Sequence, residues 1–199
     1  MSIQNPLALI PPPGLFFALA APSLLFAWAS ARIASRVRDR GVATPYTRKI
    51  YHACIFTGAA LVHGIWGVHG AVVYGTVVAA AVLAAVALGE RSGLYRALAR
   101  ESDAPHRGAF VLIPMVMTAL GGVVANLLTP GTAVFGYIVT GWGDAVGEPV
   151  GVRFGTRSYR VPSLLGVPAH RTVEGSLAVA AAGALGAFGV LLARGQGGV

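Results

Sequence analysis

Two acidic residues lie inside an otherwise apolar stretch of this sequence. Asp144 and Glu148 are four residues apart, so on a helix they would share one face and could bind a cation together. An acid within a membrane costs roughly 2.5–3.5 kcal/mol on insertion scales, so its presence there indicates a function. The alternative is a position near the membrane surface, where water and Arg153 or Arg157 would compensate both charges.

The neighbours of these acids indicate an interrupted helix and a phosphate site. Pro149 cannot donate a hydrogen bond to the carbonyl of Ala145, so we expect the helix to break near Asp144–Pro149. Glycines that permit tight turns and a close approach of phosphate to backbone amides recur here: Gly141, Gly143, Gly147, Gly151 and Gly155. Glycine is common in membrane helices, so the acids, the proline and the glycines carry this prediction only in combination.

A basic segment follows, and it ends near a further acid. It contains Arg153, Arg157, Arg160 and Arg171. Arginine binds phosphate oxygens and carboxylates bind Mg²⁺, so the segment predicts a site for a nucleoside triphosphate. Thr172 is a candidate N-cap of the next helix, which places Glu174 in the first turn, where the helix dipole favours an acid for structural reasons alone.

A second group of polar residues comes earlier in the chain. His52 is one helical turn beyond Arg48, an arrangement that suits phosphate binding or proton transfer and is equally typical of an ordinary interfacial cluster. His63 and Asn126 are polar groups within apolar stretches, and we expect them to form hydrogen bonds between helices rather than a polar path.

The composition places all of these residues in a membrane. Of the 199 residues, 55% are hydrophobic and 11% charged, and the mean hydropathy is +0.69, too apolar for one water-soluble core. We therefore predict an all-α, polytopic transmembrane bundle in a single domain, residues 1–199. Its spans, about six, are expected at 12–31, 51–69, 70–88, 109–128, 131–151 and 173–193. Residues 1–31 carry no charge, so the first span is expected to be retained rather than cleaved.

The basic residues predict the orientation. They follow the first, third and fifth spans, so these loops face the cytoplasm and both termini lie outside, in a bacterial inner or plasma membrane. The net charge of +8 lies in these loops rather than on one soluble face, which argues against nucleic acid as a partner. Cys54 is the only cysteine, so no disulfide within the chain is expected.

Three segments together resemble the polyprenol kinase family, which includes dolichol, phytol and farnesol kinases and is related to phosphatidate cytidylyltransferase. The matching segments are Arg48-Lys49…His52, Gly143-Asp144…Gly151…Gly155 and Thr172-Val173-Glu174-Gly175-Ser176, in the family's order. Arg171 stands where the family usually has lysine, and Gly147 replaces a common alanine. The resemblance implies a kinase that transfers phosphate from CTP to a long-chain isoprenoid alcohol at the cytoplasmic face of the lipid bilayer.

The resemblance and the residue chemistry together suggest roles for individual side chains. Asp144, with Glu148 or Glu174, is expected to hold Mg²⁺; Asp144, Glu174 and His52 are the catalytic candidates. The nucleotide is expected to meet Arg48, Lys49, Gly143, Gly147, Gly151, Arg153, Gly155, Arg157, Arg171, Thr172, Gly175 and Ser176. The general base stays open between His52 and an acid.

Two other functions fit the same residues. A cytidylyltransferase would transfer CMP from CTP to a lipid phosphate and release pyrophosphate. A small ion-coupled transporter would use Asp144 and Glu148 as an ion site beside a broken helix. The sequence leaves open which alcohol is used, whether UTP or ATP replaces CTP, and whether the protein is a homo-oligomer.

Overall fold

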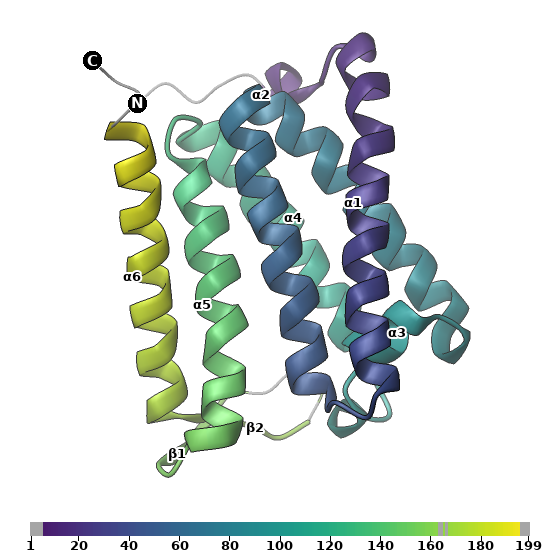
Figure 1. The fold of residues 1–199 in the computed structure, drawn as a ribbon, viewed down its shortest axis with the longest axis vertical. Helices are drawn as coiled ribbons and strands as arrows, with labels where there is room; N and C mark the ends of the chain where they lie inside the picture. The colour runs from purple at the N-terminus through teal and green to yellow at the C-terminus, as the bar shows by residue number, and fades with distance from the viewer. Residues whose placement is uncertain (1–5, 163–164, 166, 196–199) are drawn as a thin grey trace.

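Long helices run side by side along the vertical axis of the computed structural model, which describes residues 6–162, 165 and 167–195 (Figure 1). The helices are η1 (Pro6–Leu9), α1 (Pro13–Asp39), α2 (Thr44–Leu88), η2 (Gly89–Arg91), α3 (Gly93–Leu98), η3 (Glu101–Asp103), α4 (Ala109–Leu128), α5 (Ala133–Phe154) and α6 (Val173–Gly195). Two short strands, β1 (Ser158–Val161) and β2 (Ala169–Thr172), pair antiparallel before α6.

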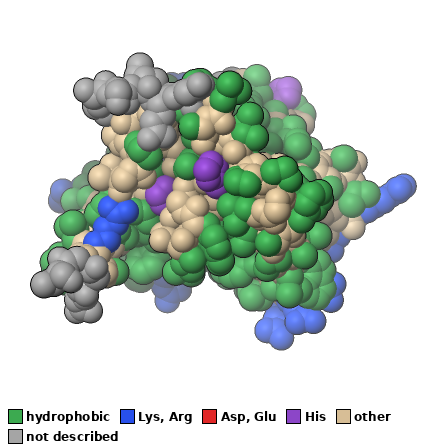
Figure 2. Space-filling view, turned by 90° about the horizontal axis from the view of Figure 1, so that it is seen from above, with side chains coloured by type: hydrophobic (Ala, Val, Ile, Leu, Met, Phe, Trp, Pro, Cys, Tyr) green, Lys and Arg blue, Asp and Glu red, His purple; other side chains and the backbone are tan. Residues whose placement is uncertain are grey.

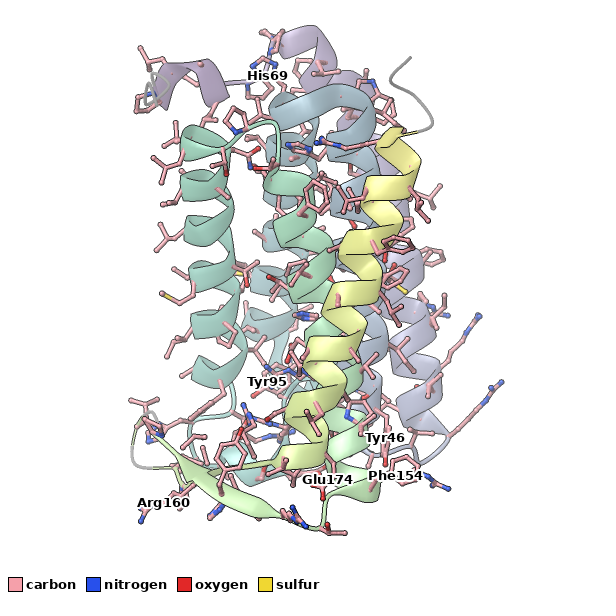
Figure 3. The ribbon with its side chains drawn as sticks, turned by 90° about the vertical axis from the view of Figure 1, so that its left-hand side faces the viewer. Tyr46, His69, Tyr95, Phe154, Arg160 and Glu174 are labelled. Carbon is pink, nitrogen blue, oxygen red and sulfur yellow. The ribbon has the colours of Figure 1, made fainter. Side chains whose placement is uncertain are left out.

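The two ends of the bundle differ in their side chains. One end, called here the charged end, carries α3, both strands and most of the basic residues. Figure 3 shows Tyr46, Phe154, Arg160 and Glu174 at this end and His69 at the opposite one, the far end. Viewed from above, hydrophobic side chains cover much of the far end (Figure 2). Glu174, one of the site residues predicted from the sequence, therefore lies at the charged end.

α2 folds back on itself at Gly67. The backbone of Gly67 has φ +61° and ψ −153°, a conformation that glycine adopts readily and other residues rarely do. Beyond it, the Tyr74 hydroxyl donates a hydrogen bond of 3.0 Å to the carbonyl of Ile55, although these residues would be about 28 Å apart on a straight helix. α2 thus has a first arm, 44–66, and a second arm, 68–88. The turn predicted near Val68–Gly70 lies one residue earlier.

Four described helices are long and apolar enough to cross a membrane: α1, α2 together with η2, α4 and α6. Their apolar side chains point outward in large part. In α4 only Asn126 is buried, while Met117 and Leu120 are among its exposed residues. An apolar outer surface of this kind requires lipid as its solvent, so the protein is a membrane protein.

α1 and α2 extend beyond the spans predicted for them. α1 continues to Asp39 and α2 begins at Thr44, so Arg32, Arg36 and Arg38, expected in a loop, lie on the last turns of α1. A helix needs no apolar side chains once it leaves the hydrocarbon layer, and basic residues near its C-terminus interact favourably with the helix dipole.

The break predicted near Asp144–Pro149 is wrong. α5 is continuous from Ala133 to Phe154, with Pro149 inside it. Proline removes only the hydrogen bond to Ala145, and α5 packs along both α2 and α6, so neighbouring helices hold it on two sides. Consequently Gly143, Gly147 and Gly151 are helical, and the tight turns expected of them are absent.

These glycines instead let α5 and α6 approach closely. A Cβ atom on Gly143 would lie 3.2 Å from Val179 Cγ1, and one on Gly147 would collide with Val179 and lie 3.2 Å from the Gly175 carbonyl. From the other side, a Cβ on Gly175 would lie 2.8 Å from the Gly147 carbonyl. Small residues four apart are a common means of close helix packing in membranes. We call this contact the glycine seam.

The antiparallel strands β1 and β2 were not predicted. Ser158 pairs with Thr172 and Arg160 with His170 in their register. The all-α prediction therefore describes the bundle but omits this small hairpin at the charged end (Figure 1).

The glycine seam predicts that Gly147→Ala destabilises the protein. The added methyl group meets Val179 and the Gly175 backbone, and overpacking of this kind costs about 1–3 kcal/mol. Gly136→Ala is the matched control on α5, because a Cβ there meets nothing within 4 Å and alanine favours a helix. Unfolding titrations in mixed micelles would compare the two variants; equal stability would contradict a tight seam.

Candidate functional site

A buried lysine joins the two acids of α5 to the first arm of α2. The Lys49 side chain is 4% exposed, and its Nζ lies 2.6 Å from Asp144 Oδ2 and 3.1 Å from Glu148 Oε2. Because the acids are one turn apart on α5, both point to α2, as their spacing predicts. Lys49 was expected to bind a nucleotide; in this structure it is the counter-ion of both carboxylates.

Arg100 extends this ion cluster towards the loops. Its Nη1 donates to Glu148 Oε1 at 2.9 Å and its Nε to Asp103 Oδ2 at 3.0 Å. Burial of Arg100 disfavours its charge, but the hydrogen bonds and negative charges of Asp103 and Glu148 outweigh this and raise its pKa above the ordinary value. Arg100 therefore stays charged and ties the segment after α3 to α5.

The sequence had not singled out Arg100 or Asp103. Both lie in a segment of mixed charges, where a pair three residues apart is usually an exposed surface feature. Asp103 is 4% exposed, and only the tertiary structure shows that this segment folds against α5. The only hint of these ion pairs in the sequence is that Glu101 and Asp103 are the acids nearest to Arg100 along the chain.

His52 lies beside Asp144 with an unused ring nitrogen. Its Nε2 is 3.3 Å from Asp144 Oδ2, but this atom is buried and has no hydrogen-bond partner among the described residues. The ring stacks near Phe56, with centroids 4.4 Å apart. A buried nitrogen without a partner is available to a polar group of a ligand.

Arg48 is the second free polar group. Its side chain is half-buried, and within the described part of the chain no residue forms an ion pair or hydrogen bond with it. Asp144, Glu148 and Asp103 act on it only at longer range. Arg48 and His52 were predicted to share a face at the charged end, and they do so beside Asp144.

A groove of about 700 Å³ begins at these side chains. It runs between the two arms of α2, α4 and α5, and apolar residues such as Ile55, Val82 and Met115 form most of its lining. Arg48, His52 and Asp144 line its charged end, and Leu9, Asn126 and Tyr137 line its far end. The groove thus combines one charged head with a long apolar body.

Glu174 lies elsewhere at the charged end. Its Oε1 accepts a hydrogen bond from Thr156 Oγ1 at 2.5 Å, and its Oε2 accepts one from the backbone of Arg157 at 3.4 Å. Thr172 Oγ1 accepts from the Gly175 amide at 3.1 Å, which confirms the N-cap expected there. Glu174 therefore holds the connection between α5 and β1.

The three expected metal ligands are not brought together. Asp144 and Glu148 lie in the ion cluster, whereas Glu174 binds residues beyond the end of α5. Among the described residues, no group of three His, Cys, Asp or Glu side chains could hold a metal ion. A pair of carboxylates, Asp144 with Glu148, is what the structure offers.

The remaining nucleotide candidates lie either on the exposed surface of the charged end or where the end of α5 meets the start of α6. Arg153, Arg157 and Arg171 are exposed at the charged end, and no described acid pairs with them. Ser176 is also exposed, and its hydroxyl lies 2.7 Å from the Tyr159 hydroxyl. Gly155 follows the last residue of α5, and its Cβ position is filled by Thr172. Gly151 and Gly175 belong to the glycine seam.

Comparisons of the chain with protein-family models, curated proteins and solved structures found no match.

The ion cluster predicts that Lys49→Met destabilises the protein. The change leaves two carboxylates without their shared counter-ion, which costs about 3 kcal/mol; this is the low end for a buried pair because Asp144 is half-exposed. Adding Glu148→Gln should restore part of the loss, because one of the uncompensated charges is then removed.

Unfolding free energies in mixed micelles would test this. Glu101→Gln is the control, because it breaks an exposed ion pair with Arg38 and should cost less than about 1 kcal/mol. A Lys49→Met protein as stable as wild type would show that the cluster does not hold α2 to α5.

Proposed function

We propose that this protein is a Mg²⁺-requiring, CTP-dependent kinase that phosphorylates a long-chain isoprenoid alcohol at the cytoplasmic face of a membrane. The observation that carries the proposal is the groove, whose apolar body ends at Arg48, His52 and Asp144. An alcohol with a long hydrocarbon chain has the same division, since only its hydroxyl needs polar partners.

The proposed topology has six crossings. α1, the two arms of α2, α4, α5 and α6 each provide one, and η2, α3 and η3 remain at the charged end. Because the basic residues gather at the charged end, this end is cytoplasmic and both termini are outside, in a bacterial inner or plasma membrane. The head of the groove then lies where nucleotides are found.

The alcohol enters the groove from lipid with its hydroxyl at the charged end. There the Nε2 of His52, which has no hydrogen-bond partner among the described residues, is placed to accept a hydrogen bond from the hydroxyl. Asp144 Oδ2, 3.3 Å from the same nitrogen, stabilises the ring once that nitrogen carries the proton. The chain lies along Ile55, Val82 and Met115, where burial of each methylene contributes about 0.8 kcal/mol.

The nucleotide binds at the surface of the charged end, where Arg153, Arg157 and Arg171 have no acidic partner among the described residues and can bind phosphate oxygens. Asp144 and Glu148 fit Mg²⁺, because this ion usually takes one or two carboxylates and completes its shell with phosphates and water. Bound with the nucleotide, Mg²⁺ neutralises charge on the triphosphate and orients it. Lys49 lies against both carboxylates as their shared cation.

In the proposed reaction, the γ-phosphoryl group of CTP passes to the alcohol oxygen at the head of the groove. The alcohol oxygen forms a bond to the γ-phosphorus as the bond from that phosphorus to CDP breaks, and the hydroxyl proton passes to His52 Nε2 and then to water. Arg48 lies half-buried at the head of the groove, where it stabilises the charge of the transferred phosphoryl group. The products are an isoprenoid phosphate and CDP.

The free guanidinium of Arg48 also supports a second candidate, a cytidylyltransferase. A lipid phosphate in the groove would place its charged head at Arg48, and CMP transfer would then release pyrophosphate. An ion-coupled transporter has less support, because the described part of α5 is unbroken at the acids and the break in α2 at Gly67 lies towards the far end.

The kinase proposal predicts that label from γ-labelled CTP enters the organic phase. Purified protein in detergent with Mg²⁺ would be given farnesol, geranylgeraniol, phytol and a longer polyprenol. Asp144→Asn should lower the rate by roughly 10²–10³-fold, since it removes a charge that both stabilises protonated His52 and holds Mg²⁺.

Asp39→Asn is the matched control, because Asp39 is an exposed acid paired with Arg96 away from the groove, and its rate should equal that of wild type. Pyrophosphate release from α-labelled CTP with a lipid phosphate, and no labelled alcohol product, would replace the kinase with a cytidylyltransferase. If CTP, UTP and ATP all give neither product, the proposal is wrong and ion uptake into vesicles becomes the next measurement.

A further inference from the structure

Three polar side chains from three helical segments meet at the far end of the groove. The Asn126 amide nitrogen donates to the Tyr137 hydroxyl at 2.7 Å and to the Gly122 carbonyl at 2.8 Å, and its oxygen lies 3.1 Å from His63 Nε2. His63 and Asn126 are 6% and 3% exposed. We call His63, Asn126 and Tyr137 the polar rung. The chemistry proposed above, at the charged end, makes no use of it.

Leu9 covers the same end of the groove. It is buried, lines the groove, and belongs to η1, which packs against α2 and α4. A 2.9 Å hydrogen bond between His69 Nε2 and the Ala8 carbonyl fixes η1 to α2 at the far end, where Figure 3 labels His69. The groove is therefore bounded by a charged cluster at one end and by Leu9 and the polar rung at the other.

The length between these boundaries follows from the first arm of α2. His52 at the head of the groove and His63 in the polar rung are 11 residues apart on this arm, a distance of about 16 Å. An extended carbon chain advances roughly 1.2–1.3 Å per bond, so the groove holds a main chain of about 13 bonds. This length suits a sesquiterpenoid alcohol such as farnesol and is too short for geranylgeraniol, a polyprenol or dolichol.

We propose that Leu9 and the polar rung form a stop that sets the longest isoprenoid chain the groove accepts. A chain end that reached past the rung would have to break hydrogen bonds between buried groups and leave them without partners. A longer chain must instead displace Leu9 or leave its end in lipid, where it gains nothing from the protein. This inference rests on the proposed function, because it takes an isoprenoid chain to be the occupant.

Two substitutions should move the stop in opposite directions. Gly75 lines the groove on the second arm of α2, and a Cβ there meets nothing within 4 Å, so Gly75→Leu adds a side chain at the groove with no clash at its Cβ. Leu9→Ala removes the cover instead. The matched controls are Gly64→Leu, at an exposed glycine with open space outside the groove, and Ile10→Ala, at the exposed neighbour of Leu9.

The test is binding of tritiated farnesol to detergent-purified protein without nucleotide, in competition with geraniol, geranylgeraniol and a long polyprenol. Wild type should prefer farnesol to geranylgeraniol and to the polyprenol. Gly75→Leu should weaken farnesol about tenfold, the loss of roughly two buried methylenes, and leave geraniol within about twofold. Leu9→Ala should strengthen the polyprenol about tenfold, and both controls should match wild type.

Binding without nucleotide separates this inference from the proposed function. A length-dependent profile that shifts as expected, with no label transferred from CTP, supports the stop and overturns the kinase. Label transfer to alcohols of every length alike, with Gly75→Leu and Leu9→Ala unchanged in binding, supports the kinase and overturns the stop. Absence of binding by any alcohol overturns both.

Discussion

Charge compensation at the charged end governs how this bundle is assembled. Lys49 lies almost fully buried between Asp144 and Glu148, and such a set is stable only if every charge has its partner. The first arm of α2 must therefore dock against α5 at one height, because a shift by one turn would carry Lys49 past one of the two acids and leave that charge without its counter-ion. That alignment also brings His52 to Asp144 and opens the groove beside them.

α5 carries two different patterns of four-residue spacing, one beside the other. Asp144 and Glu148 face α2, while Gly143 and Gly147 face α6, so one helix joins the ion cluster to the glycine seam. The seam brings the start of α6, with its Thr172 cap, against the last turns of α5. The end of α5, the two strands and the start of α6 follow one another in the sequence and thus lie together at the charged end.

Local signals in the sequence predicted local features well. The turn after the first arm of α2 and the N-cap at Thr172 were predicted from residue types that favour them, and the structure has both within a residue. Features that depend on distant partners were missed: Pro149 is tolerated because α2 and α6 support α5, and Arg100 is identified only by its contact with Glu148. The glycines were assigned to tight turns beside a phosphate site, but their spacing of four fits a helix seam equally well, and only packing decides between the two.

The charge balance of the cluster also constrains how a metal could reach it. Arg48, Lys49 and Arg100 stand against Asp103, Asp144 and Glu148, so the group is close to neutral as it is. A bare divalent cation would add positive charge beside three cations in a site of low dielectric, which is unfavourable. A cation that arrives with a triphosphate brings more negative than positive charge, and Arg48 then gains the partner it lacks. In the proposed reaction the metal therefore binds as part of the nucleotide complex rather than before it.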